Sequence, residues 1–208
     1  MMNNLIQFEC QQCGLCCQTK YLCLYPLELN LAKKYAQKLN KELKVEPLRK
    51  ILDIQHQKII VLIYRVIDRP CPFFSMNQCQ IHQNKFIACR KYPISSWIDL
   101  GNAFKILGFN NEFYDVDNKC SFIQTHTAFK KLLTEFPLSS ILFNEYQAVL
   151  EDKRIWMELD RKFTLLKKQG KITSINENKL KKNNLRQYEE IIKSWEQLSA
   201  IDFLNYFG

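Results

Sequence analysis

The chain has 208 residues but only five glycines, which stand singly at positions 14, 101, 108, 170 and 208. A dinucleotide-binding fold needs a glycine-rich turn between a strand and a helix, and a phosphate-binding loop needs several glycines close together. Neither pattern is present, and no serine or cysteine nucleophile motif stands out. The sequence therefore argues against a Rossmann-type domain for a nucleotide or a methyl donor.

Long apolar segments are also missing. The longest unbroken apolar run, IIVLIY at residues 59–64, is far too short to span a bilayer. The first ten residues, MMNNLIQFEC, contain no apolar core of a signal peptide. We therefore expect no membrane span and a cytoplasmic, reducing location, in which disulfides rarely persist.

Positive charge exceeds negative charge: 30 Lys and Arg against 21 Asp and Glu give a formal net charge of +9. Such a surplus attracts anionic partners in general. The basic residues are spread along the chain without a clustered stripe, which disfavours nucleic-acid binding. We expect a protein or redox partner instead, of a kind that the composition does not specify.

All nine cysteines lie between Cys10 and Cys120, and the chain from Ser121 onward contains none. We interpret residues 1–120 as a cysteine-cluster metal-binding module and residues 121–208 as a helical extension packed on it. The predicted fold class is α+β, with a small metal-organised module followed by a mainly helical C-terminal extension.

Three segments of the module carry local structural signals. Residues 26–39 predict a helix that begins at Pro26, with an apolar stripe formed by Leu27, Leu31, Tyr35 and Leu39. The segment EPLRKILDI, residues 46–54, predicts a shorter helix that begins at Pro47. The β-branched segment KIIVLIYRVID, residues 58–68, predicts a strand, and AFKILGF, residues 103–109, predicts a weaker one.

The C-terminal part has helical periodicity. Apolar residues recur at spacings of three, four and seven from Leu142 to Leu166, which predicts a long helix capped by Ser139 or Ser140 and ending near Gly170. A last helix is predicted from the similar spacing of Leu185, Tyr188, Ile192 and Trp195. Both apolar stripes are expected to face the core.

The segment CQQCGLCC places four thiols within eight positions: Cys10, Cys13, Cys16 and Cys17. Gly14 allows their loop to turn sharply. Spacings of two residues between cysteines suit both zinc and iron–sulfur sites, and a run of three favours a cluster, which presents several iron atoms to one loop. Adjacent side chains are expected to diverge, so Cys16 and Cys17 would serve two centres or two corners of one larger centre.

A second group of thiols lies downstream, at Cys71, Cys79, Cys89 and Cys120. The Cys71-Pro72 pair is similar to the remote ligand of bacterial ferredoxins. Eight thiols are enough for two four-thiolate sites, while the odd total and the reducing location disfavour a disulfide framework. Cys23 is the ninth, and we expect it to be a buried apolar residue.

The chain resembles the CxxCxxCC cysteine-cluster family, which is described as zinc- or iron-chelating and includes flagellin lysine N-methylases. The resemblance rests on CQQCGLCC, on CPFF and CQIH, and on CRKYP, and it covers residues 8–120. It implies that eight cysteines bind metal: Cys10, Cys13, Cys16, Cys17, Cys71, Cys79, Cys89 and Cys120. The chain departs from the family pattern at His82, where a tyrosine is usual, and at Lys85-Phe86, where an Arg-Pro pair is usual.

Two further residues near these thiols deserve weighing. His82 follows Cys79 by three residues and is either a metal ligand or a neutral imidazole held by hydrogen bonds. Arg90 follows Cys89 and is a candidate cofactor-binding residue, because it could donate a hydrogen bond to a thiolate sulfur or offset its charge. The alternative is that Arg90 forms an ion pair on the surface.

Three functions compete at this point. The first is an iron–sulfur protein, with a [4Fe–4S] cluster in a redox or cluster-assisted enzymatic role. The second is a zinc-stabilised binding module. The third, implied only by the resemblance, is a protein lysine N-methyltransferase that uses S-adenosylmethionine. No catalytic residue is identified, and the sequence favours the first function.

Overall fold

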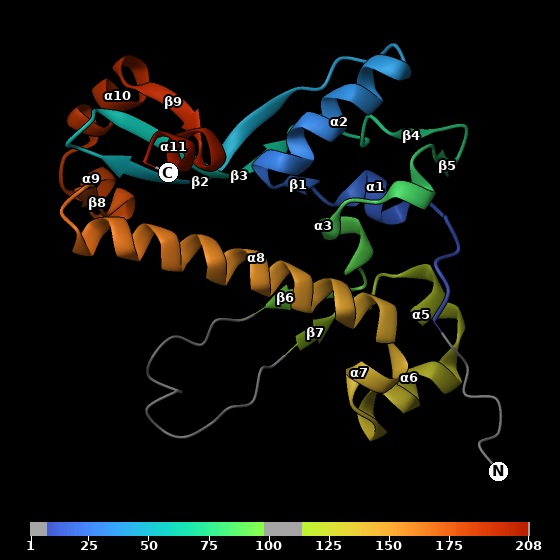
Figure 1. Ribbon diagram of the computed structural model, residues 1–208. Helices are drawn as coiled ribbons and strands as arrows, with labels where there is room; N and C mark the ends of the chain where they lie inside the picture. Colours follow the sequence, from blue (N-terminus) through green and yellow to red (C-terminus); the bar gives the residue numbers. More distant parts are fainter. Residues whose placement is uncertain (1–7, 98–113, 208) are drawn as a thin grey trace.

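The computed structural model describes residues 8–97 and 114–207 (Figure 1). Its N-terminal part contains α1 (Leu15–Thr19), β1 (Cys23–Leu24), α2 (Pro26–Lys38), β2 (Val45–Asp53), β3 (Lys58–Val66), β4 (Phe74–Ser75), β5 (Gln78–Cys79), the 3₁₀ turn η1 (His82–Asn84), α3 (Ile87–Arg90) and β6 (Ile94–Trp97). The later part contains β7 (Tyr114–Val116), α5 (Ser121–Thr125), α6 (Thr127–Glu135), α7 (Leu138–Ile141), α8 (Phe143–Lys168), β8 (Ser174–Ile175), α9 (Glu177–Asn183), α10 (Leu185–Ser194), β9 (Glu196–Ser199) and α11 (Ala200–Tyr206). This mixture confirms the predicted α+β class, with helices in the C-terminal part.

The main sheet is built on the β2–β3 hairpin. Its strand order is β1-β3-β2-β8, and β9 pairs in parallel with β3. Both faces of β3 are covered: Ile60 and Leu62 pack with residues of α8 and α11, while Ile59 and Val61 pack with residues of α9 and α10. Burial on both sides explains why this strand is a continuous apolar run, as predicted for residues 58–68.

The segment that precedes the hairpin turn corrects one prediction. Residues 46–54 are not a helix, because Val45–Asp53 forms β2 and pairs with β3 from Val45↔Val66 to Asp53↔Lys58. The helical signal at Pro47 was local, and pairing with the neighbouring strand outweighs such a weak preference. Register shifts on both sides of Arg49 accommodate the proline in this strand.

Helix α2 forms where predicted, from Pro26 to Lys38, but only part of its predicted apolar stripe packs against the core. Leu27 is 71% exposed and Leu31 is 41% exposed, while Ala32 and Ala36 are buried against the sheet. Small side chains allow the helix axis to approach the sheet closely. The predicted helix is therefore confirmed, and of its apolar stripe Tyr35 and Leu39 pack against the core while Leu27 and Leu31 do not.

Helix α8 confirms the long C-terminal helix and crosses the molecule in Figure 1, with the main sheet and α2 above it and β6, β7, α6 and α7 below it. The predicted serine cap is wrong, because Ser139 and Ser140 belong to the short helix α7 and Leu142 precedes α8. Gly170 follows the helix end with a positive φ of 66°, as expected for a helix-ending glycine. The last predicted helix is α10, from Leu185 to Ser194.

The C-terminal part also supplies strands to the main sheet, since β8 pairs with β2 and β9 pairs with β3. A boundary at residue 120 remains a prediction. The strand predicted at residues 103–109 lies outside the described residues. Within the described ranges, none of the helices has the length and apolar character needed to cross a membrane.

Asp53 is a fully buried carboxylate at the end of β2. It lies 2.5 Å from His56 Nδ1, in the hairpin turn, and accepts a hydrogen bond of 2.9 Å from the Thr173 N–H, just before β8. It therefore connects the hairpin to the C-terminal strand.

We expect Asp53→Ala to lower the free energy of unfolding by about 2–3 kcal/mol, because it leaves the groups that bond this carboxylate without a partner. Chemical denaturation followed by circular dichroism measures the loss. Asp160→Ala, on an exposed position of α8, is the matched control and should change stability by less than about 0.5 kcal/mol. Equal effects of the two substitutions would contradict the role of Asp53.

Candidate metal centre

Seven of the eight predicted ligands surround one small cavity of about 60 Å³, which we call the thiol cavity. Its lining includes Cys10, Cys13, Cys16, Cys17, Cys79, Cys89 and Cys120. Cys71 is the eighth, and its backbone N–H donates to the Cys17 carbonyl at 2.7 Å, so it lies next to the same loop. The structure thus brings together thiols from distant parts of the chain, while their role as metal ligands remains a prediction.

The thiol cavity lies between two hydrophobic clusters. Cys10 and Cys120 belong to the cluster around Phe122 and Phe129, which α5, α6 and α8 help to form. Cys71, Cys79 and Cys89 pack against the other cluster, which lies between α2 and the sheet. A metal bound in the cavity would therefore join two separate cores.

The tight N-terminal loop forms because Gly14 adopts a φ of 75°, a conformation that side chains other than glycine rarely adopt. Gly14 precedes α1, which carries Cys16 and Cys17. The Phe74 ring occupies the space that a Cβ on Gly14 would need. The predicted turn is confirmed, and its glycine is required by both backbone and packing.

The five-thiol group consists of Cys16, Cys17, Cys71, Cys79 and Cys89, which interact electrostatically. The Cys16 and Cys17 sulfurs lie 4.0 Å apart, so the expectation that these adjacent side chains diverge is wrong. Both follow Gly14 in the short helix α1, whose geometry turns the two sulfurs toward the same cavity.

Protons are unequally shared within the five-thiol group. A hydrogen bond from Cys17 lowers the pKa of Cys16 to about 7, and one from Cys17 also lowers the pKa of Cys79 to about 6. The pKa of Cys17 itself is raised, because these bonds hold its proton. Burial raises the pKa of Cys71 to about 11 and, together with repulsion from the other thiolates, raises that of Cys89. Mutually repelling thiolates in partial burial favour a bound cation.

The three-thiol group consists of Cys10, Cys13 and Cys120. Burial raises the pKa of Cys120, and charges on Cys13 and Cys10 add to the effect. The Ser121 hydroxyl donates to the Cys13 sulfur at 2.9 Å. Tyr92 lines the thiol cavity and lies close enough to thiols of both groups to interact with them electrostatically. Its pKa is raised first by burial and then by charges that include Cys120, Cys16 and Cys13.

Backbone N–H groups orient three of the sulfurs. The N–H belongs to the second residue after the cysteine in Cys71 with Phe73 and in Cys79 with Ile81, while Cys120 accepts from Ile123 and, with a smaller effect, from Phe122. These hydrogen bonds lower the pKa of each thiol and so oppose the effect of burial. Donors aimed at sulfur are the outer-shell interactions that support thiolate ligands and set cluster potentials.

His82 lines the thiol cavity, and its Nδ1 atom is buried without a hydrogen-bond partner among the described residues. The sequence left open a neutral imidazole held by hydrogen bonds, but no described residue forms such a bond with this nitrogen. Burial, followed by the positive charge of Lys85, lowers the pKa of His82, which keeps the imidazole neutral and able to accept. An orphaned nitrogen beside thiols suits a metal-bound or cluster-facing position.

Arg90 donates to Glu151 Oε2 on α8 at 2.8 Å and is not part of the thiol cavity lining. Its side chain is 42% exposed. This is the surface ion pair considered as the alternative from the sequence. Cofactor binding by Arg90 remains a prediction.

Two cavity residues were not found by sequence reasoning. Lys85 lowers the pKa of both Cys16 and Cys79, after the larger effect of the Cys17 hydrogen bond and against burial. Ser121 holds Cys13. A positive charge four residues before Cys89 and a hydroxyl directly after Cys120 were visible in the sequence, but only the fold places them at the sulfurs.

Soft thiolate donors, with one neutral imidazole, fit zinc or iron. Within residues 8–97 and 114–207, no three His, Cys, Asp or Glu side chains already stand at distances that would enclose a single metal ion. A metal centre is therefore supported by the shared cavity, the electrostatic interactions between thiols and the N–H···S bonds.

The model of the CxxCxxCC family, described as "Putative zinc- or iron-chelating domain", matches residues 9–121. The chain belongs to this family. Membership confirms the resemblance seen in the sequence and supports zinc or iron chelation. Comparisons with curated proteins and with solved structures found no match.

We expect Gly14→Ala to destabilise this CxxCxxCC domain and to reduce its metal content, because the new methyl group overlaps the Phe74 ring in a strained backbone conformation. Metal content per chain and denaturant unfolding measure both effects. Gly170→Ala is the matched control, since Gly170 also has a positive φ but has no atom within 4 Å of the added Cβ. The control should cost about 1 kcal/mol and Gly14→Ala roughly 1–3 kcal/mol more. Equal losses in the two variants would argue against tight packing at Gly14.

Proposed function

We propose that this protein holds an iron–sulfur cluster of the [4Fe–4S] type and uses it in electron transfer or in cluster-assisted catalysis. The observation that carries the proposal is the five-thiol group, which brings together from distant parts of the chain the four thiolates that a [4Fe–4S] cluster needs. The Cys-x2-Cys-x2-Cys run supplies Cys16 to this group and Cys10 and Cys13 to the three-thiol group beside it. When bound, such a cluster supplies one-electron redox chemistry or a Lewis-acidic iron.

The residues divide into two sets under this proposal. Four thiolates of the five-thiol group would hold the cluster. The three-thiol group, formed by Cys10, Cys13 and Cys120, would hold a second centre together with one further ligand. The orphaned Nδ1 atom makes His82 a candidate for that ligand or for a donor to the first centre.

Other residues of the chain prepare the site. The Lys85 ammonium favours the thiolate forms of Cys16 and Cys79 and offsets part of their negative charge. The N–H groups that follow Cys71, Cys79 and Cys120 orient sulfur lone pairs. Partial burial excludes water from the thiols of the five-thiol group and from Cys120, which strengthens these electrostatic effects, while Cys13 is exposed.

Zinc is the second candidate, and one distance favours it. Two thiolates on one zinc ion with bonds of about 2.3 Å would lie roughly 3.8 Å apart in a tetrahedral site. The 4.0 Å between the Cys16 and Cys17 sulfurs is close to that value. In this case the protein is a zinc-stabilised binding module. A lysine N-methyltransferase that uses S-adenosylmethionine has no support among the described contacts and is implied by the family resemblance only.

Metal analysis separates these candidates. Protein purified without oxygen, from cells supplied with both iron and zinc, is expected to be brown and to contain iron and acid-labile sulfide in equal amounts, about four of each per cluster. Elemental analysis and sulfide determination provide the measurement. Stoichiometric zinc, with no iron or sulfide even after anaerobic reconstitution, would replace the iron–sulfur proposal with the zinc module.

Substitution of single thiols tests the ligand set. Cys13→Ala is expected to lose metal and to lower the free energy of unfolding by more than about 2 kcal/mol, or roughly 4–8 °C in Tm, because bound metal contributes to folding. Cys23→Ala is the matched control, since Cys23 does not line the thiol cavity, and it should retain full metal content. Full metal in Cys13→Ala, or equal metal loss in both variants, would remove Cys13 from the proposed ligands.

A further inference from the structure

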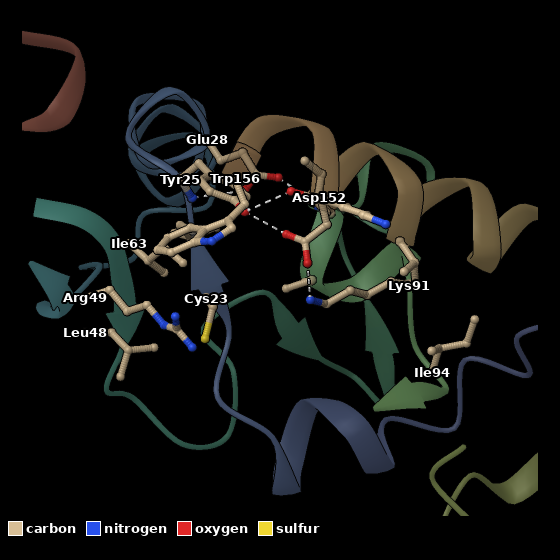
Figure 2. Close-up of a pocket in the computed structure, with 15 residues that line it drawn as sticks. Cys23, Tyr25, Glu28, Leu48, Arg49, Ile63, Lys91, Ile94, Asp152 and Trp156 are labelled. Carbon is tan, nitrogen blue, oxygen red and sulfur yellow. Dashed lines mark hydrogen bonds and ion pairs between the residues drawn. The ribbon is translucent and has the colours of Figure 1, made fainter. Parts of the chain in front are cut away.

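A second and larger cavity of about 340 Å³ lies between α2, β2, α3 and α8 (Figure 2). Its volume is at the lower end of the range found for small-molecule sites. Its apolar lining includes Leu48, Ile63, Val149 and Trp156. We call this space the α8 pocket. It contains none of the eight predicted metal ligands, although Cys23 lies in its wall.

The two carboxylates of the α8 pocket already have partners. Asp152 accepts from the Tyr25 hydroxyl at 2.8 Å and from Lys91 Nζ at 2.6 Å, as the dashed lines in Figure 2 show. Glu28 accepts from the backbone N–H groups of Tyr25 and Ile87, at 3.1 and 2.7 Å. Both oxygens of each carboxylate are therefore engaged in holding α2, α3 and α8 together.

The guanidinium of Arg49 differs from these groups. It lies over the Trp156 ring, 5.1 Å from the ring centroid, and makes no ion pair or hydrogen bond to any described residue. Arg49 is solvent-exposed, so a ligand can reach it. This cation–π contact uses none of the guanidinium N–H donors as hydrogen bonds to protein, so they are available for a planar anion.

Charged groups of both signs line the pocket. Its basic residues are Arg49, Lys91 and Lys153, and its acidic residues are Glu28 and Asp152. Burial, followed by the charge of Asp152, raises the pKa of Tyr25, so the phenol stays neutral. Burial likewise raises the pKa of Cys23, which stays a neutral thiol. Both carboxylates are engaged, whereas the Arg49 guanidinium makes no ion pair to a described residue, so an anion is favoured over a cation.

We propose that the α8 pocket binds a small organic carboxylate, with its carboxylate on the Arg49 guanidinium and its apolar body against Trp156 and the neighbouring aliphatic side chains. This goes beyond the proposed function and does not depend on which metal the protein holds. The α8 pocket also lies on the other side of the α3 turn from the thiol cavity. Ala88 and Lys91 line the α8 pocket, while Cys89 and Tyr92 line the thiol cavity, so different faces of the α3 turn meet the two spaces.

The test uses the metal-containing full chain and three probes that share one apolar body: 2-naphthoate, the neutral 2-naphthamide and the cationic 2-naphthylmethylammonium. Ligand-observed NMR titrations give the dissociation constants. We expect 2-naphthoate to bind with a Kd below about 1 mM and at least about tenfold more tightly than the amide, because a charge-assisted bidentate bond is lost in the amide. The ammonium probe should bind more weakly than both.

Variants then assign the anion contact. Arg49→Met keeps a flexible chain over Trp156 but should weaken 2-naphthoate binding at least about tenfold, with little effect on the amide. Arg49→Lys should restore part of the affinity, since it keeps the charge and loses the fork. Arg161→Met, on an exposed position of α8 outside the pocket, should leave binding unchanged. Tm and metal content are compared across the variants to confirm that each is folded.

Three results would overturn the proposal: equal affinity for carboxylate and amide, unchanged 2-naphthoate binding in Arg49→Met, or preference for the ammonium probe. Absence of binding by all three probes would overturn it as well. None of these outcomes concerns the metal analysis, so the failure of this proposal is distinguishable from failure of the proposed iron–sulfur function.

Discussion

The burial of several thiols at one point, between two hydrophobic clusters, is the constraint on which the rest of the structure depends. Cys10 and Cys120 come from one cluster, and Cys71, Cys79 and Cys89 come from the other. Thiolates held this close repel one another and lose hydration, so in the absence of a cation most of these thiols keep their protons, as the raised pKa values of Cys17, Cys71 and Cys89 show. Binding free energy from a metal would therefore also be folding free energy, because the ligands meet only in the folded chain.

The C-terminal part contributes to this arrangement through α8. Glu151 and Asp152 on this helix pair with Arg90 and Lys91, which follow Cys89 directly. The same chain segment supplies β8 and β9 to the main sheet. The cysteine-rich part is thus supported by one helix, α8, and two strands, β8 and β9, from a region without cysteines.

Local sequence signals succeeded where one effect dominated and failed where two competed. The β-branched run that became β3 is buried on both faces, so its pattern was unambiguous. Residues 46–54 fit a helix as well as a strand, and the hairpin decided for the strand. For α2, the helix was predictable, but Leu27 and Leu31 face outward because the sheet accepts the smaller Ala32 and Ala36. Which face packs is a property of the partner surface.

The cysteine spacings by themselves predicted a zinc- or iron-chelating domain, because thiols at two-residue intervals are typical of such sites, and the family model supports this prediction. Only the tertiary structure decided that seven of these thiols share one cavity and that Lys85, Ser121 and an orphaned His82 nitrogen stand beside them. It alone assembled the α8 pocket, whose lining comes from β1, α2, β2, β3, α3, β6 and α8. The physical reason is that electrostatic and packing interactions act over a few ångströms in space, whatever the separation along the chain.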